Sequence, residues 1–250
     1  MIFSIALREL RSLFLSPLAW TVLAATQFIL AWAFLAQVDG YLQLQTKLAA
    51  LPTAPGVTDL VVAPLFNMAS VVLLMVCPLL TMRLVSEERR SGTLSLLLSS
   101  PVSMTEIVLG KYLGILVFML IFVSQITLMP LSLLMGADLD LGKLAAGVLG
   151  LTLLLAAFCA AGLYISTLAL NPSVAAVGTF GLLLALWMLD SAGKGPEQTE
   201  TIFNYLSLLH HNTPMLRGIV NSSDIVYYLL FIATFLILSI RRLDTQRLRG

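Results

Sequence analysis

The chain has 250 residues, of which 59% are hydrophobic and only 11% are charged. A soluble domain is about 45–50% apolar and about 25% charged, so this composition excludes a chain that surrounds itself with a water-facing surface. The formal net charge of +1 excludes a strongly basic nucleic-acid-binding protein. We therefore expect an integral membrane protein without a nucleic-acid partner.

Residues 1–17 predict a helix that lies in the membrane interface, rather than a signal peptide. Charged residues interrupt the apolar run at Glu9 and its neighbours, and no small-residue cleavage site follows. On a helical wheel one polar stripe is formed by Ser4, Arg8, Arg11 and Ser12. Ser16 and Pro17 should end this helix and turn the chain into the first span.

Six apolar stretches reach or approach the roughly 20 residues that a helix needs to cross a bilayer. They are Leu18–Ala36, Val61–Leu84, Tyr112–Leu134, Leu144–Leu170, Val174–Leu189 and Ile225–Ile240. Backbone polar groups in lipid must be satisfied within the protein, so each stretch predicts an α-helix. The expected fold class is all-α and polytopic, with residues 18–250 forming one transmembrane domain of six helices.

The basic residues indicate how the chain is oriented in the membrane. One side has ten of them: Arg8, Arg11, Arg83, Arg89, Arg90, Lys111, Arg241, Arg242, Arg247 and Arg249. The other side has four: Lys47, Lys143, Lys194 and Arg217. We therefore expect both termini and the loop 83–111 in the cytoplasm, and a large loop 190–224 outside.

Motifs for catalysis and nucleotide binding are missing from the sequence. No stretch has the glycine–lysine–serine/threonine pattern of a phosphate-binding loop, and no His-Glu-x-x-His, Cys-x-x-Cys or Gly-x-Ser-x-Gly occurs. We expect no catalytic residue, no metal site and no cofactor bound by this chain. No ionisable residue lies near the middle of a span, which disfavours an ion-coupled carrier.

Several residues inside or beside the spans allow a structural and a functional interpretation. The polar set is Gln27, Asn67, Ser124, Gln125, Thr127, Ser166 and Thr167, for which bonding to a neighbouring helix is favoured over substrate binding. For Cys77 and Cys159, for the stripe Met68, Met75 and Met82, and for His210 and His211, packing or loop polarity is favoured over a disulfide or a metal site. The roles of the methionines and histidines stay open.

The loop that begins at Arg83 and reaches Pro101 contains three distinct pieces. A mixed-charge cluster should prolong the second span into water, and Gly92 should end it; the cluster is Glu87, Glu88, Arg89 and Arg90. A short segment with Leu94, Leu97 and Leu98 on one face follows, and it needs a partner groove or the membrane surface because a helix this short is unstable alone. Ser103 and Glu106 then form a capping box that starts a helix through Gly110-Lys111 into the third span.

This loop resembles that of ABC-2 type transporter permeases. The shared pattern runs from Glu88 through Gly92-Thr93-Leu94 to Pro101 and Gly110-Lys111, and the likeness is strongest to the gliding-motility (GldF-like) branch. Three further segments are similar to that branch: Ser16–Trp20, Gly162–Leu168 with Asn171, and Tyr205–Tyr228. The resemblance extends over nearly the whole chain.

The resemblance implies a permease subunit of the bacterial inner membrane that works as a homodimer or pseudo-dimer with two copies of an ABC ATPase. ATP and Mg²⁺ would bind in that partner. Residues 1–17 would be the connecting helix, in contact with membrane lipid. The implied coupling residues are Glu87, Glu88, Arg89, Arg90, Gly92, Thr93, Leu94, Leu97 and Leu98. The function would be export of an unidentified substrate, or alternatively ATP-driven transmission of force to an extracytoplasmic partner.

The resemblance also implies an outer gate made by short helices in the last outside loop. We expect such helices at Phe203–Leu209 and Met215–Val220, with an ordinary loop as the alternative. The candidate gate residues are Phe203, Tyr205, Leu206, Met215 and Ile219.

Overall fold

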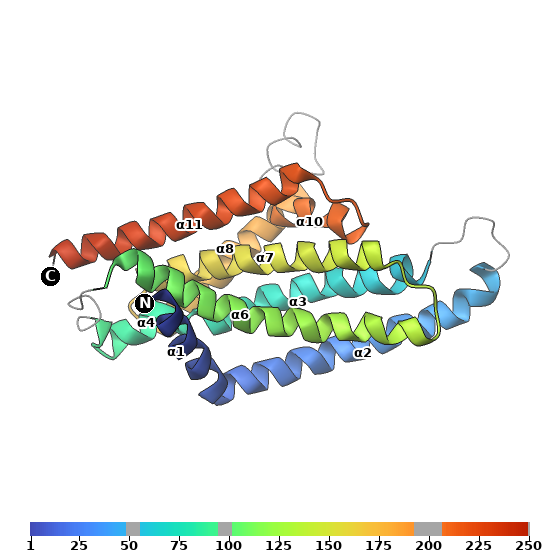
Figure 1. The fold of residues 1–250 in the computed structure, drawn as a ribbon, viewed down its shortest axis with the longest axis horizontal. Helices are drawn as coiled ribbons and strands as arrows, with labels where there is room; N and C mark the ends of the chain where they lie inside the picture. The colour runs from blue at the N-terminus through green and yellow to red at the C-terminus, as the bar shows by residue number, and fades with distance from the viewer. Residues whose placement is uncertain (49–55, 95–101, 193–206, 250) are drawn as a thin grey trace.

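A computed structural model describes residues 1–48, 56–94, 102–192 and 207–249, and every regular element within these ranges is a helix (Figure 1). Five stretches are long and apolar enough to cross a membrane: Pro17–Gln45, Thr58–Arg90, Met104–Met135, Leu141–Leu168 and Ser222–Leu248. A sixth apolar helix, Pro172–Met188, is shorter. The predicted all-α, multi-pass organisation is confirmed.

The first two helices meet at the predicted break. Helix α1 (Ile2–Leu15) ends at Ser16, which adopts an extended conformation (φ −81°, ψ 121°), and α2 (Pro17–Leu48) begins at the proline. The helix continues beyond Ala36, where the first apolar stretch was predicted to end, and has 32 residues in all. No proline follows before Pro52, and the polar residues after Ala36 include glutamines, which favour helix.

The second span is a helix with one break. A π-helical turn, η1 (Thr58–Val62), leads into α3 (Ala63–Thr81), and α4 (Arg83–Arg90) follows after Met82. Ser166 of another helix satisfies the first turn of α4: its Oγ accepts bonds from the backbone N–H of Val85 (3.0 Å) and Ser86 (3.1 Å) and donates to Met82 O (3.0 Å). The predicted role of Ser166 as a helix-to-helix contact is thereby confirmed.

The third span begins at the predicted capping box. The Ser103 hydroxyl accepts from the Glu106 backbone N–H at 3.2 Å, and the Glu106 carboxylate accepts from the Ser103 N–H at 3.2 Å. Helix α6 (Met104–Leu131) then runs without interruption past Lys111 and passes into the 3₁₀ turn η2 (Ser132–Met135).

Helix α7 (Leu141–Leu168) lies at the centre of the bundle. Buried residues make up 72% of its apolar window, against 28% for α2 and 22% for α11 (Ser222–Arg249). Asp140 caps its start through bonds from the N–H groups of Gly142 and Lys143. At Gly162 a Cβ would lie only 2.3 Å from Thr81 Oγ1, so this glycine allows α3 and α7 to pack closely.

A short turn joins α7 to α8 (Pro172–Ala192), and α10 (Leu208–Leu216) precedes α11. The predicted helix Met215–Val220 is wrong: α10 ends at Leu216, Gly218 has a positive φ of 86°, and Ile219 and Val220 are exposed. Phe203, Tyr205 and Leu206 lie outside the described residues.

The bundle has two ends that differ in content (Figure 1). Helix α1, helix α4 and both chain termini lie at one end, which we call the α4 end. Helix α10 and the C-terminal part of α2 lie at the other, which we call the α10 end. Between them, Gln27 of α2 donates to Gln125 of α6 at 2.8 Å, and Cys77 and Cys159 are free thiols with sulfurs 4.0 Å apart.

Candidate functional site

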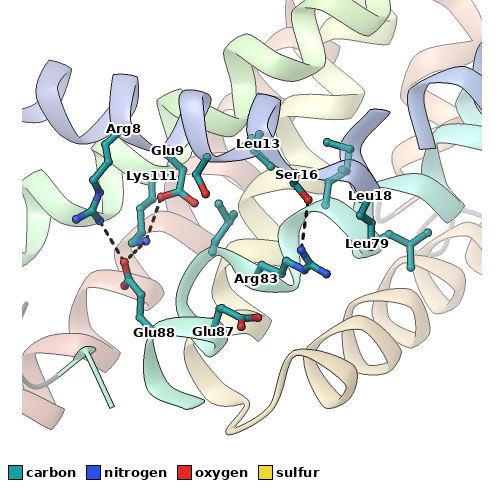
Figure 2. A pocket seen from close by; sticks show the side chains of 14 residues that line it. Arg8, Glu9, Leu13, Ser16, Leu18, Leu79, Arg83, Glu87, Glu88 and Lys111 are labelled. Atoms are coloured by element: carbon teal, nitrogen blue, oxygen red, sulfur yellow. Dashed lines mark hydrogen bonds and ion pairs between the residues drawn. The ribbon is translucent and has the colours of Figure 1, made fainter. Parts of the chain in front are cut away.

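A buried lysine joins three helices at the α4 end. The side chain of Lys111 on α6 is only 2% exposed, and its ammonium group lies 2.8 Å from Glu88 of α4 and 3.3 Å from Glu9 of α1. Arg8 of α1 makes a second ion pair with Glu88 at 3.2 Å. Figure 2 shows these four side chains converging from three helices. One carboxylate, Glu88, therefore connects α4 to both α1 and α6.

Two glycines on α6 make this arrangement possible. A Cβ at Gly110 would lie 2.7 Å from Ile5 Cβ, and one at Gly114 would lie 2.8 Å from Glu9 Cβ. Helix α1 can therefore lie directly on the backbone of α6, which brings Glu9 within reach of Lys111. From the sequence, Lys111 was assigned to the basic cytoplasmic loop and no partner was predicted for it. The signal that indicates a partner is Glu9, the acidic residue that interrupts the apolar run of α1.

The next residue of α4 binds the other half of the bundle. Arg89 donates to the backbone carbonyls of Thr167 (2.9 Å), Leu168 (3.3 Å) and Ala169 (3.2 Å) at the C-terminal end of α7. It also donates to Gln246 Oε1 of α11 at 2.7 Å. A cation at a helix C-terminus satisfies free carbonyls and is favoured by the helix dipole.

The segment after α4 forms a turn. Gly92 has φ of 74°, which residues with a side chain rarely adopt, and the Thr93 hydroxyl donates to Glu88 O at 3.3 Å. The predicted helix break at Gly92 is confirmed. Glu87 and Arg90 are exposed, whereas Leu94 is only 8% exposed and packs against the chain itself. Leu97 and Leu98 lie outside the described residues.

A cavity of about 400 Å³ adjoins the Lys111 cluster, between α1, the start of α2, and the end of α3 with α4 (Figure 2). Its walls include Ser16, whose hydroxyl accepts a long bond of 3.4 Å from Arg83. Its lining contains both charged side chains and leucines, among them Leu18 and Leu79.

The α10 end is held by hydrogen bonds and close packing. His211 Nδ1 lies 2.7 Å from Asp224, its ring stacks on Tyr227 at 4.1 Å, and the Tyr228 hydroxyl donates to Leu208 O at 2.6 Å. Met215 is fully buried. The rings of His210 and His211 lie edge to face with centroids 5.9 Å apart, and among the described residues no group of three or more His, Cys, Asp or Glu could hold a metal ion.

The fold and the charged junction together indicate a class of protein. Long apolar helices surround a central helix, and a charged helix-to-helix junction lies at one end beside a turn. This is the organisation of a multi-pass α-helical membrane protein. In the described residues the charged cluster at this end joins three helices to one another.

A comparison with family models identifies the family. The model described as ABC-2 family transporter protein matches residues 3–248, so the chain belongs to the ABC-2 family of transporter membrane proteins. This family has no catalytic activity of its own, and its members function with an ABC ATPase partner. A comparison with curated proteins gave no match.

Proposed function

We propose that this chain is the permease subunit of an ABC-2 transporter that couples ATP hydrolysis by a separate ATPase to the export of a substrate not yet identified. The observation that carries the proposal is the position of α4. Glu88 connects it to α1 and α6, and Arg89 connects it to α7 and α11. A displacement delivered to the loop after α4 would therefore act on both halves of the bundle.

Six membrane crossings with both termini in the cytoplasm complete the proposal. Both termini lie at the α4 end (Figure 1), which requires an even number of crossings after α1. Five long apolar stretches give an odd number, so α8 would be the sixth span. The ten basic residues assigned to the cytoplasm support this orientation. The membrane would be the bacterial inner membrane, and the branch the GldF-like one.

The partner contact would lie in the turn and segment that follow α4. Gly92 and Thr93 are exposed there, together with Glu87 and Arg90. Glu88 and Arg89 are engaged within the chain, so any contact they make with the ATPase would come in addition to those bonds. We propose two ATPase copies, which hold ATP and Mg²⁺, on a homodimer or pseudo-dimer of permeases.

Helix α10 would serve as the outer gate. It packs on α7 with His211, Asn212 and Met215 buried, and Asp224 and Tyr228 of α11 hold it in place. Ile219 is exposed beyond the end of the helix and would form the rim of the gate rather than its packed part.

The decisive test is reconstitution with an ATPase that lacks membrane spans. We expect the two proteins to co-purify, and we expect Leu97→Glu with Leu98→Glu to abolish that binding. Leu94 is less suitable for this test because it is buried within the chain. The matched control is Leu248→Glu, which changes an 88% exposed leucine at the same end and should leave binding intact.

Failure to find an ATPase partner, or binding that survives the double substitution, would contradict the coupling proposal. ATPase turnover of the complex, screened against lipids, amphipathic drugs, peptides and glycans, then identifies the substrate class. Basal turnover that no candidate substrate stimulates would instead favour transmission of force to an extracytoplasmic partner.

A further inference from the structure

A second hollow at the α4 end has a chemistry that the coupling proposal does not use. It has a volume of about 700 Å³ and lies between α1, the start of α2 and the first residue of α4. Three arginines and three serines contribute to its lining: Arg8, Arg11, Arg83, Ser4, Ser12 and Ser16. The only other residues that line it are Leu7, Leu15 and Pro17.

The charge in this hollow is of one sign. No acidic residue lines it, whereas the neighbouring cavity contains Glu9, Glu87 and Glu88. Arg8 lines both spaces and forms an ion pair with Glu88. Arg11 and Arg83 make no ion pair among the described residues. Both are exposed. Two guanidinium groups and nearby hydroxyls are thus available to an anion with several oxygens.

The hollow lies where the first apolar span begins. Pro17 is the first residue of that candidate span, and Arg83 follows the apolar helix α3, so we expect the arginines at the level of the lipid headgroups. Leu7 and Leu15 are 50% and 83% exposed on α1. Leu79, which lines the neighbouring cavity, is 41% exposed one turn before Arg83. An occupant with an anionic head and acyl chains matches both parts.

We propose that this hollow binds the phosphate group of an anionic phospholipid at the membrane surface. Arg11 and Arg83 bind the phosphate oxygens, Arg8 and the serine hydroxyls complete the ring of donors, and the acyl chains extend along Leu15, Leu18 and Leu79. Basic pockets beside transmembrane helices recognise anionic headgroups through this combination of charge and depth. Bound lipid would link α1 to the start of α4 from outside the bundle.

Tryptophan fluorescence can test the site because Trp20 lies one helical turn beyond Ser16 and Pro17. Its indole N–H donates to Phe14 O at 2.7 Å, which fixes it beside the junction of α1 and α2. In the full chain with Trp32→Phe and Trp187→Phe, Trp20 is the only tryptophan left. The nanodiscs contain unbrominated phosphatidylcholine, to which one brominated lipid is added. Brominated phosphatidylglycerol should quench the Trp20 fluorescence at about a tenfold lower mole fraction than brominated phosphatidylcholine does.

Substitutions then test whether the preference for phosphatidylglycerol depends on the arginines of the hollow. Arg83→Gln should raise the mole fraction of brominated phosphatidylglycerol needed for half-quenching about fivefold, and Arg11→Gln with Arg83→Gln should remove the preference. Arg83→Lys keeps the charge and should retain most of it. The matched control is Arg241→Gln, an exposed arginine of α11 outside the hollow, which should leave the preference unchanged. Helical circular dichroism confirms that each variant is folded.

Three results would overturn the proposal. The first is equal quenching by the two brominated lipids, and the second is a preference that survives loss of both arginines. The third is loss of the preference on adding inorganic phosphate but not potassium chloride of equal ionic strength, which would assign the hollow to a soluble anion. A preference for phosphatidylglycerol that depends on Arg11 and Arg83 and resists phosphate supports a lipid site.

Discussion

Two lysine–carboxylate contacts at opposite ends of the bundle show how differently the ends are built. Lys111 at the α4 end is 2% exposed and lies between Glu88 and Glu9, at 2.8 and 3.3 Å. Lys143 at the α10 end is 33% exposed and contacts a single residue, Asp59, at 2.8 Å. The first contact joins three helices across buried space, whereas the second joins the start of α7 to η1 at the surface.

The difference indicates where ionic contacts stabilise the fold and where close packing does. Removing one member of a buried ion pair leaves an uncompensated charge out of water, which is costly, while exposed pairs contribute little. At the α10 end the buried contacts include the pair His211–Asp224, 2.7 Å apart, and packing contacts such as Gly150 beneath Asn212 and Met215. Charged side chains therefore join three helices at the α4 end, whereas close packing on α7 contributes more at the α10 end.

The largest expected effect comes from removing the buried lysine charge. Lys111→Met leaves Glu9 without its cation and Glu88 with only the exposed Arg8, so we expect a loss of about 3 kcal/mol in the free energy of unfolding. Thermal unfolding of the detergent-solubilised protein measures it. Adding Glu88→Gln should recover part of the loss; a double substitution with the full additive cost would mean that the two groups are not coupled.

The fit at the α10 end is tested by adding one methyl group. A Cβ at Gly150 would lie 2.6 Å from Asn212 Oδ1 and 2.9 Å from Met215 Cβ. Gly150→Ala should therefore destabilise by about 2 kcal/mol despite the better helix propensity of alanine. Gly181→Ala is the matched control, because nothing lies within 4 Å of its Cβ position, and it should be neutral or stabilising. Equal effects at the two glycines would show that α10 is not closely packed on α7.

Neutral bonds at the α4 end should matter less than its ions. Ser166→Ala removes the acceptor of the Val85 and Ser86 N–H groups, for an expected cost of about 1.5 kcal/mol. Ser124→Ala is the control, since Ser124 is exposed and donates only to Ile121 O of its own helix. Unfolding by denaturant compares the two variants, and a cost at Ser166 no greater than at Ser124 would rule out support of α4 by Ser166.

The smallest effect should come from the exposed lysine. Lys143→Met makes the same chemical change as Lys111→Met but at a solvated pair, so its shift in unfolding temperature should be much smaller and should shrink further as salt is added. Shifts in unfolding temperature of similar size for the two lysine variants would contradict the proposed difference between the two ends.

Local signals in the sequence predicted most elements, whereas pairings across the bundle were not predictable. Six apolar runs indicated helices, and the break at Ser16 and the capping box of Ser103 followed from residue types next to each other. The ion pair of Glu9 with Lys111 joins residues 102 positions apart, and it depends on the close approach allowed by Gly110 and Gly114. Neither charge nor hydropathy indicates such a distant pairing.

The candidate coupling site shows the same limit. The sequence identified the cluster Glu87–Arg90 and the break at Gly92, because charges and a glycine end an apolar run. It treated the four charges as solvated or partner-facing. The structure turns Glu88 and Arg89 toward opposite halves of the bundle, since adjacent helical residues point about 100° apart and each meets complementary groups on distant helices.

The length of α2 has a consequence for the surface opposite the termini. Its 32 residues span about 48 Å, while the hydrocarbon core is about 30 Å thick. If Pro17 lies at one boundary, the helix leaves lipid near Gln37 and continues for about 18 Å, with Gln43 bonded to Asp39 at 2.9 Å along the way. The membrane face at the α10 end therefore carries a helical projection, to which another protein could bind without entering the bilayer.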